Sequence, residues 1–321
     1  MKGASFSIEP VPPLDFDLTA GYLTYFRGRY GTDVFEEGVY RRMQRLNGGL
    51  ALLSVWSTGT IDAPMLEAEV RSDSLDEEMI VEARESLAWL LGTADDLVPF
   101  YEMADADLHL PPVVKGMYGL HIAHTSTAYE ALVLAILGQQ ISTHVARMLR
   151  NLITETYGES LEVDGELYRV FPSPQSLADA GVEALRSIKF SQKKAEYISD
   201  ISKQVASGEL DLESFRNQPA GEVVKSLTKI RGIGPWTAHW VLIRALGYPD
   251  GFPHGDLAMQ RMMGMLVHPD ADSPKPMSSK EATDYSERWS PFRSYVTTYI
   301  FGAGRSGRFE EFVRGGNHHS Q

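Results

Sequence analysis

One short stretch limits the folds open to this chain more than any other: LTKIRGIGPWTAHW, at residues 227–240. A helical pattern ends at Ile230, a turn follows, and Pro235 opens the next helical pattern. Gly232 and Gly234 permit a left-handed or crowded backbone in the turn. Proline is tolerated in the first turn of a helix because its missing N–H would have no partner there. The stretch therefore predicts two helices joined by a tight turn.

This turn has two interpretations. It can be an ordinary helical corner with Ile233 in the core. It can also bind a phosphate, because Gly232 and Gly234 place no side chain between the backbone amides and an approaching anion, and the following helix adds its N-terminal dipole. Such a site would grip a nucleic-acid backbone without reading its sequence. Composition alone gives the two interpretations similar weight.

The charge of the chain is unevenly distributed. The net charge of −13 argues against nucleic acid, whose affinity for proteins depends on Lys and Arg. However, residues 1–110 hold 8 Lys and Arg against 20 Asp and Glu, whereas residues 186–245 hold 10 against 6. The acidity is thus concentrated in the first third, and the region of the turn is mildly basic. The overall charge therefore weighs less against a nucleic-acid partner than its size suggests.

The sequence divides into two patterns. Residues 1–112 predict a mixed domain of antiparallel strands and helices, and residues 113–305 predict a helical region. Residues 104–122 contain two prolines and no sustained period, which indicates a connection between the domains. Residues 306–321 read as a polar tail. The predicted fold class is α+β.

Several classes of site and location are disfavoured. The absence of cysteine excludes disulfides and thiolate metal sites, and the nine scattered histidines suggest no metal site. No apolar run approaches the roughly 18 residues that a membrane span requires. The first residues lack the apolar core of a signal peptide, so a cytoplasmic protein is expected.

Three separate segments carry a family resemblance. Residues 227–246, with the following loop GYPDGFPHGD, resemble the helix-hairpin-helix motif of the HhH-GPD superfamily of DNA glycosylases. Residues 131–158 resemble the helix pair of its 3-methyladenine DNA glycosylase II (AlkA-type) branch, and residues 287–301 resemble the last helix of that branch. Three matches in the same order are more specific than the hairpin alone.

The resemblance implies a catalytic role for Asp256, which matches the aspartate that follows the hairpin. Cleavage of a base–sugar bond develops positive charge on the deoxyribose, which a fixed carboxylate beside the sugar stabilises. A lone aspartate before a helical pattern is more often only an N-cap, and the two roles can coexist.

The resemblance also implies a base pocket formed by Trp236, Trp240 and Phe301, although aromatic residues at helical spacing are usually core. An alkylated cationic base would stack well on such rings and would leave without a general acid. Family members that also cut the DNA backbone carry a lysine where this chain has Trp236. A monofunctional enzyme that leaves an abasic site is therefore expected.

The remaining implications concern DNA. The hairpin Arg231–Gly234, that is Arg231, Gly232, Ile233 and Gly234, would hold the DNA backbone. Gln140 lies near the position from which the family fills the gap left by a flipped nucleotide, although Gln140 can equally be an exposed glutamine. The expected partner is double-stranded DNA with alkylated bases, bound by a monomer associated with the bacterial nucleoid. No cofactor is required, and the family resemblance permits a monovalent cation at the hairpin.

Two alternatives stay open: a non-catalytic DNA-damage-binding protein, and a glycosylase with lyase activity on oxidised purines. The sequence assigns no role to His254 or to the loop at 268–279, and it does not rank the alkylated bases.

Overall fold

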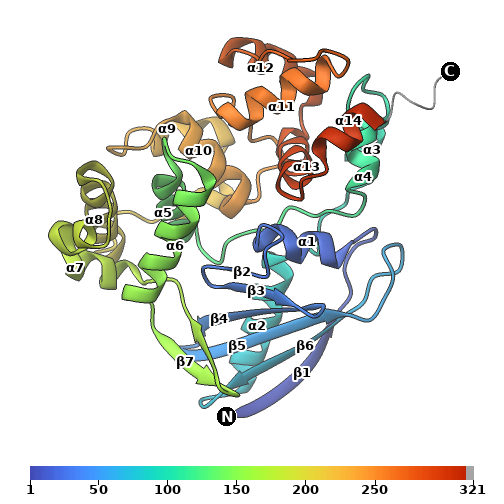
Figure 1. The fold of residues 1–321 in the computed structure, drawn as a ribbon. Coiled ribbons are helices and arrows are strands. Elements are labelled where there is room, and N and C mark those ends of the chain that lie inside the picture. The colour runs from blue at the N-terminus through green and yellow to red at the C-terminus, as the bar shows by residue number, and fades with distance from the viewer. Residues whose placement is uncertain (316–321) are drawn as a thin grey trace.

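The computed structural model describes residues 1–315 (Figure 1). Its N-terminal part is one antiparallel sheet with the strand order β1-β6-β5-β4-β3-β2. The strands are β1 (Lys2–Ile8), β2 (Arg29–Tyr30), β3 (Asp33–Glu36), β4 (Val39–Leu46), β5 (Gly49–Ser57) and β6 (Leu66–Ser72). Alternation sets the buried face, as in β6, where every second residue is buried. Helices α1 (Phe16–Leu23) and α2 (Glu77–Leu90) belong to the same core as this face.

The rest of the chain is mainly helical, as the apolar spacing predicted. The helix predicted to run through or to break at Gly138 is two helices, α5 and α6, separated by a short loop. The α-helices of this part are α5 (Ala128–Gly138), α6 (Thr143–Tyr157), α7 (Pro174–Ser187), α8 (Gln192–Ala206), α9 (Ala220–Leu227), α10 (Pro235–Val241), α11 (Leu257–Val267), α12 (Ser279–Ser286), α13 (Arg293–Arg305) and α14 (Phe309–Gly315). Three further short helical segments are η1 (Glu213–Asn217), η2 (Leu242–Leu246) and η3 (Glu287–Trp289).

The helical region contains one strand pair that the sequence interpretation missed. Strands β7 (Ser160–Val163) and β8 (Glu166–Arg169) form a hairpin around Asp164 and Gly165, which both have left-handed backbone angles. Asp-Gly is a strong signal for this type of turn. The hairpin packs Val163 onto the second face of the N-terminal sheet, in a small core of its own.

The predicted connection at 104–122 is also wrong in part. Helix α3 (Val98–Asp105) reaches into this segment, and α4 (Pro111–Gly116) lies within it. Both prolines of the segment, Pro111 and Pro112, lie in the first turn of α4, where proline is tolerated. The prolines therefore begin a helix rather than mark an irregular linker.

Two large hydrophobic cores organise the molecule. The terminal core joins the N-terminal sheet and helices α1–α4 to helices α11–α14. The central core is formed by α5–α10 with η1 and η2. The ends of the chain thus share one core while the middle of the chain forms the other. The domain boundaries predicted at 112 and 305 stay predictions, and the cores divide the chain differently.

Part of the predicted polar tail is a packed helix. In α14, Phe309 and Val313 are buried, and Gly116 of α4 leaves room for the ring of Phe312. Residues 316–321 of the predicted tail lie outside the described residues.

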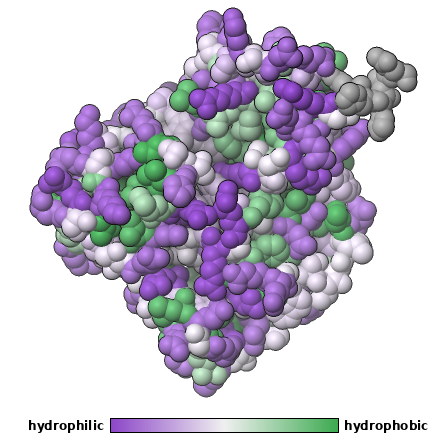
Figure 2. Space-filling model, viewed as in Figure 1, coloured by the Kyte–Doolittle hydropathy of each residue, from purple (hydrophilic) through white to green (hydrophobic). Residues whose placement is uncertain are grey.

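The outer surface is mainly polar. Hydrophilic residues dominate the face drawn in Figure 2, and hydrophobic residues form small patches between them. Within residues 1–315, no helix combines the length and hydrophobicity that crossing a bilayer requires.

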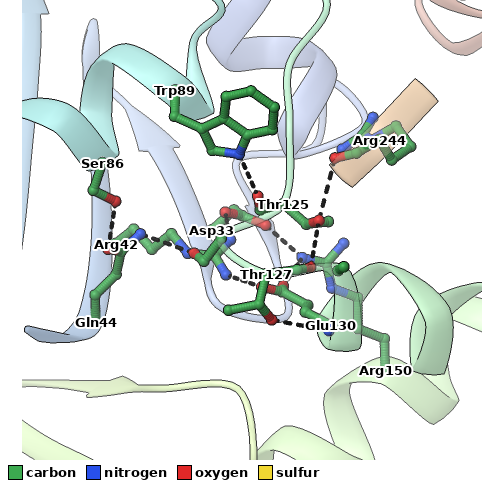
Figure 3. Close-up of polar contacts among 12 residues, drawn as sticks. Asp33, Arg42, Gln44, Ser86, Trp89, Thr125, Thr127, Glu130, Arg150 and Arg244 are labelled. Atoms are coloured by element: carbon green, nitrogen blue, oxygen red, sulfur yellow. Dashed lines mark hydrogen bonds and ion pairs between the residues drawn. The ribbon is translucent and has the colours of Figure 1, made fainter. Parts of the chain in front are cut away.

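A buried ion-pair cluster joins the sheet to the central helices (Figure 3). We define it as Asp33, Arg42, Glu130 and Arg150. The guanidinium of Arg42 donates to Asp33 Oδ1 and to Glu130 Oε2, both at 2.6 Å, and Arg150 Nη2 donates to Asp33 Oδ2 at 2.5 Å. Burial alone would raise the pKa of Asp33, but the charges of Arg42 and Arg150 outweigh it and hold that pKa below its ordinary value. The cluster therefore fixes β3 and β4 against α5 and α6.

Candidate functional site

Asp256 lies where the loop after η2 ends and α11 begins. It is the N-cap of α11, as its position before an apolar helix predicts. Its Oδ1 accepts hydrogen bonds from the amides of Ala258 at 2.9 Å and Met259 at 3.1 Å. The side chain is only partly buried. The capping bonds therefore fix the carboxylate while one oxygen, Oδ2, stays available for other contacts.

Trp236 donates a hydrogen bond to this second oxygen of Asp256. It lies in the first turn of α10, and its indole Nε1–H donates to Asp256 Oδ2 at 2.8 Å. One helical turn further, the ring of Trp240 lies edge-on to Trp236, with centroids 6.4 Å apart. The structure thus joins the hairpin helix directly to the carboxylate that follows it.

Helix α13 completes this group. The ring of Phe301 lies 5.2 Å from that of Trp240, and the guanidinium carbon of Arg305, one helical turn later, lies 5.5 Å from the Phe301 ring. We call Trp236, Trp240, Asp256, Phe301 and Arg305 the site cluster. It combines residues of α10 with residues of α11 and α13, so it lies where the central core meets the terminal core.

Two tyrosines, one in the last turn of α1 and one just after this helix, contact Arg305. The guanidinium carbon of Arg305 lies 4.3 Å from the ring centroid of Tyr22 and 3.9 Å from that of Tyr25. Three buried polar atoms in this region have no hydrogen-bond partner: Tyr22 Oη, Trp240 Nε1 and Arg305 Nη1. Buried polar atoms are normally paired, so three such atoms around one group of rings mark a place where a polar ligand can bind.

The hairpin has the geometry expected of a close backbone turn. Gly232 has φ +89°, and a Cβ there would lie 2.3 Å from the ring of Tyr197, so only glycine fits. Ile233 is buried in the central core and anchors the turn, as the corner interpretation predicted. The first hydrogen bond of α10 runs from the Ala238 amide to the Gly234 carbonyl, which leaves the preceding amides of the first turn without helical acceptors.

Arg231 is not a free cation. Its guanidinium pairs with Glu196 at 2.6 Å and with Asp200 at 3.3 Å, and it lies over the ring of Tyr197. These contacts brace the hairpin against α8. They also neutralise the positive charge that a phosphate would otherwise meet.

The two glutamines after Gly138 have different environments. Gln139 donates to the Gly232 carbonyl at 2.9 Å and to Thr237 Oγ1 at 3.0 Å, so it ties the α5–α6 loop to the hairpin. Gln140 is exposed and has φ +55°. A Cβ on Gly138 would lie 3.6 Å from the ring of Trp236, which places this loop beside the site cluster. An exposed side chain in that position suits the predicted gap-filling role of Gln140, which stays a prediction.

Comparison with known proteins agrees with this geometry. Residues 133–288 match the HhH-GPD superfamily of base excision DNA repair proteins. The DNA-3-methyladenine glycosylase of Bacillus subtilis is 38% identical over 207 residues, which cover 64% of this chain and 67% of that protein. The DNA-3-methyladenine glycosylase 2 of Escherichia coli is 32% identical over 57% of this chain and 60% of its own length. The chain therefore spans about two thirds or less of either curated relative.

A solved structure matches almost the whole chain. The 3-methyladenine DNA-glycosylase from Archaeoglobus fulgidus superimposes with a TM-score of 0.80 at 28% identity, over 94% of this chain and 98% of the other. This chain belongs to the HhH-GPD superfamily. The predicted family resemblance, the α+β fold class and the prediction of a DNA glycosylase are confirmed.

Other predicted features of this HhH-GPD chain fall outside the site cluster. His254 Nδ1 hydrogen-bonds with Ser279 Oγ at 2.7 Å, and its carbonyl accepts from Gln260, so it braces the loop before Asp256. The segment at 268–278 packs along α11, where the Met277 amide donates to the Gln260 carbonyl. In the described part of the chain, no group of three or more His, Cys, Asp or Glu side chains is arranged to hold a metal ion.

Sequence reasoning missed Tyr22, Tyr25 and Arg305. Arg305 follows Phe301 by four residues, so helical spacing could have placed both on one face of α13. Nothing in the local pattern of the tyrosines indicates that α1 reaches the site, because that contact depends on the shared terminal core. A separate cavity of about 150 Å³, lined by Arg29, Gly31 and Asn151 among others, contains none of the site residues.

Proposed function

We propose that this protein is a monofunctional DNA glycosylase that flips alkylated bases out of double-stranded DNA and excises them hydrolytically, leaving an abasic site. The observation that carries the proposal is the Asp256 carboxylate, held by two backbone amides and by the indole N–H of Trp236, whose ring begins the series Trp236, Trp240 and Phe301. The names of the relatives from Bacillus subtilis and Escherichia coli support DNA-3-methyladenine as the type of substrate.

Asp256 is the proposed catalytic residue. Its three hydrogen-bond donors are all neutral, so they orient the carboxylate without cancelling its charge. As the base departs, the sugar gains oxocarbenium character, and a fixed negative charge beside it lowers the energy of that state. The same carboxylate can orient the water that attacks the anomeric carbon.

The aromatic side chains are the proposed receptor for the flipped base. The centroid of the Trp240 ring lies 6.4 Å from that of Trp236 and 5.2 Å from that of Phe301, and both contacts are edge-to-face. Alkylation of a ring nitrogen makes a base cationic, and a cation is attracted to indole faces. A cationic base is also a good leaving group, so the protein need not protonate it.

The proposed lack of lyase activity rests on the residue at position 236, where lyases of this family carry a lysine. Lyase chemistry requires a lysine that attacks the sugar, and Trp236 stands at the corresponding position. The nearby Lys194 is also unsuited, because its Nζ is turned into the protein and donates to the Leu137 carbonyl at 2.6 Å. Hydrolysis by water is therefore the reaction that the site supports.

The hairpin is the proposed binding site for the DNA backbone. Gly232 and Gly234 let a phosphate approach the free amides at the start of α10, while Gln140 fills the space left by the flipped nucleotide. A monomer binds the duplex in this scheme. No cofactor is required, and a monovalent cation at the hairpin carbonyls is compatible with it.

The test is base release from a duplex treated with a methylating agent, followed by alkali to cut abasic sites. We expect free methylated purines, with strand breaks only after alkali. Asp256→Asn should fold and bind the duplex but lose about 10³-fold in rate, because asparagine caps helices as well as aspartate but carries no charge. Asp211→Asn is the matched control, since Asp211 also accepts from two backbone amides and lies outside the site cluster.

Other outcomes would point to the alternatives. Tight binding with no release from several methylated duplexes would favour a damage-binding protein without turnover. Strand breaks before alkali, together with an adduct trapped by borohydride, would favour a glycosylase with lyase activity.

A further inference from the structure

Arg305 is held by aromatic rings on several sides. The rings of Tyr22, Tyr25 and Phe301 all lie within 5.5 Å of its guanidinium carbon. Its Nη1 is buried without a hydrogen-bond partner. Burial by itself lowers the pKa of Arg305, but its neighbours, Tyr22 and Tyr25 above all, raise it overall. The guanidinium is therefore a full positive charge within the site cluster, and the faces of aromatic rings hold it in place.

The ring of Tyr25 is part of a longer stack of flat side chains. The rings of Tyr25 and Tyr30 lie nearly parallel, with centroids 4.3 Å apart and an interplanar angle of 28°. The guanidinium carbon of Arg150 lies 4.3 Å from the Tyr30 centroid. Four flat groups thus follow one another in the order Arg305, Tyr25, Tyr30 and Arg150. We call this series the tyrosine stack.

The far end of the stack is fixed. Arg150 is buried and pairs with Asp33 of the buried ion-pair cluster at 2.5 Å (Figure 3). Because Asp33 also binds Arg42, the position of Arg150 is set by several charged contacts at once. The stack therefore runs from Arg150, fixed by the buried ion-pair cluster, to Arg305 in the site cluster that contains the proposed catalytic carboxylate.

The backbone at the near end is strained. Tyr25 has φ +55° and Phe26 has φ +54°, two consecutive side-chain-bearing residues in the left-handed region. The turn is held by a hydrogen bond of 2.7 Å from the Phe26 amide to the Gly21 carbonyl. A Cβ on Gly21 would lie 2.7 Å from the Phe26 ring, so glycine is required there. Such strain persists only where the surroundings enforce it, and it is often found at functional sites.

We propose that Tyr25 is a positioning residue for base excision, which holds Arg305 at its place in the site cluster and takes its own position, through Tyr30, from Arg150. The inference rests on the function proposed above. Without the ring of Tyr25, the guanidinium of Arg305 is free to move toward Asp256 and to pair with it. Pairing would cancel the negative charge that stabilises the sugar cation, so excision would slow while the DNA grip of the hairpin stays intact.

The first experiment measures single-turnover excision from methylated duplex DNA, together with the Kd for a duplex with an abasic-site analogue. Tyr25→Leu and Tyr30→Leu should each slow excision about tenfold, the effect of losing roughly one good cation–π contact, with an unchanged Kd. Tyr25→Phe and Tyr30→Phe should excise at nearly the wild-type rate because the rings remain. The control is Tyr118→Leu, which breaks a comparable stack, on Tyr101 at 5.3 Å, that involves no residue of the site cluster.

The Tyr30→Leu variant tests the proposal most directly, because Arg305 stacks on Tyr25 and not on Tyr30. An effect of this variant on excision must therefore pass through Tyr25. If both leucine variants excise as fast as Tyr118→Leu, the proposal is overturned. A fall in DNA affinity in proportion to the rate would also overturn it, since that would show a general structural role.

The second experiment is independent of activity. Selective ¹⁵N-arginine labelling gives side-chain NMR signals, and the signal of Arg305 should be displaced by the ring currents of its aromatic neighbours. Tyr25→Leu and Tyr30→Leu should both move this signal, whereas Tyr118→Leu should not. An enzyme that releases no base but shows these shifts would refute the proposed function and retain the positioning of Arg305. An unmoved signal in Tyr30→Leu would refute the transmission through the stack.

Discussion

The molecule holds two carboxylates in contrasting ways. Asp33 is fully buried and accepts from two guanidinium groups and from the hydroxyl of Tyr40. Asp256 is partly exposed and accepts from an indole and two backbone amides. Both are fixed, but only the first is neutralised by its hydrogen-bond donors. A carboxylate surrounded by cations joins elements of the fold, whereas one held by neutral donors keeps its charge available for a substrate.

The largest expected effect on stability tests the first of these carboxylates. Arg42→Met removes the cation between Asp33 and Glu130 and leaves two buried carboxylates poorly paired. We expect a loss of about 3–5 kcal/mol in the free energy of unfolding, measured by urea titration. Arg41→Met, on the partly exposed face of the same strand, should cost far less. Equal losses for the two variants would show that packing, rather than ion pairing, stabilises this junction.

The next effect tests the second carboxylate. Trp236→Phe keeps an aromatic ring but removes the donor to Asp256 Oδ2, so the carboxylate loses part of its fixed orientation. Excision should fall by about 10- to 100-fold, roughly the value of one well-placed donor in an active site. Trp89→Phe is the control, because it removes an indole bond to the Thr125 carbonyl away from the site. If the two variants excise equally well, the indole bond has no role in orienting Asp256.

A smaller effect concerns the pH dependence of stability. It extends the comparison to His124, a side chain that is buried in its neutral form, whereas Asp33 is buried as a charge. His124 is buried against Trp89, and burial lowers the pKa of its imidazole from 6.5 to about 3. A lowered pKa means that the unfolded chain binds the proton more readily. The stabilisation by neutral His124 is therefore complete above pH 6.5 and is lost as the pH falls toward 3, by at most about 1.4 kcal/mol per pH unit.

The measurement is the free energy of unfolding at several pH values between 4 and 7. His124→Phe keeps a ring against Trp89 but cannot take up a proton, so its stability should fall less steeply with decreasing pH. His144→Phe, at an exposed position, should follow the wild-type slope. Identical slopes for all three proteins would mean that His124 is not kept neutral by the fold.

The smallest effect concerns Arg231 of the hairpin. Because Glu196 and Asp200 already pair with its guanidinium, Arg231→Gln should weaken duplex binding less than about threefold and barely change the salt dependence. Titration of a labelled duplex at two salt concentrations gives both quantities. A loss of one full phosphate contact in the salt slope would show that Arg231 leaves its carboxylate partners when DNA binds.

The local features of the site were largely predictable from the sequence. The hairpin turn, its two glycines and Pro235 follow from the backbone requirements of a tight turn before a helix. The N-cap position of Asp256 follows from an aspartate before an apolar helical pattern. The β7–β8 hairpin was missed although Asp164-Gly165 is a strong turn signal, because the surrounding apolar spacing was interpreted as helical.

The contacts between distant segments were not predictable in this way. Tyr25 and Arg305 are separated by almost the whole chain, and nothing in either local pattern indicates that they meet. The same holds for Asp33 and Arg150, whose pairing joins a strand to a helix of the other core. Sequence patterns encode backbone conformation over a few residues, whereas these contacts arise only when distant elements pack together, as α1 and α13 do in the terminal core.

The sequence by itself therefore determined the hairpin, the helices around it, the absence of a lysine at position 236 and the family to which these features belong. Each of these depends on residues that are neighbours along the chain. Only the tertiary structure decided that Asp256 is held by neutral donors, that Arg231 is already paired and that two tyrosines at the end of α1 and just after it contact Arg305. The physical reason is that the charge and orientation of a side chain depend on what packs against it, and those partners come from distant parts of the chain.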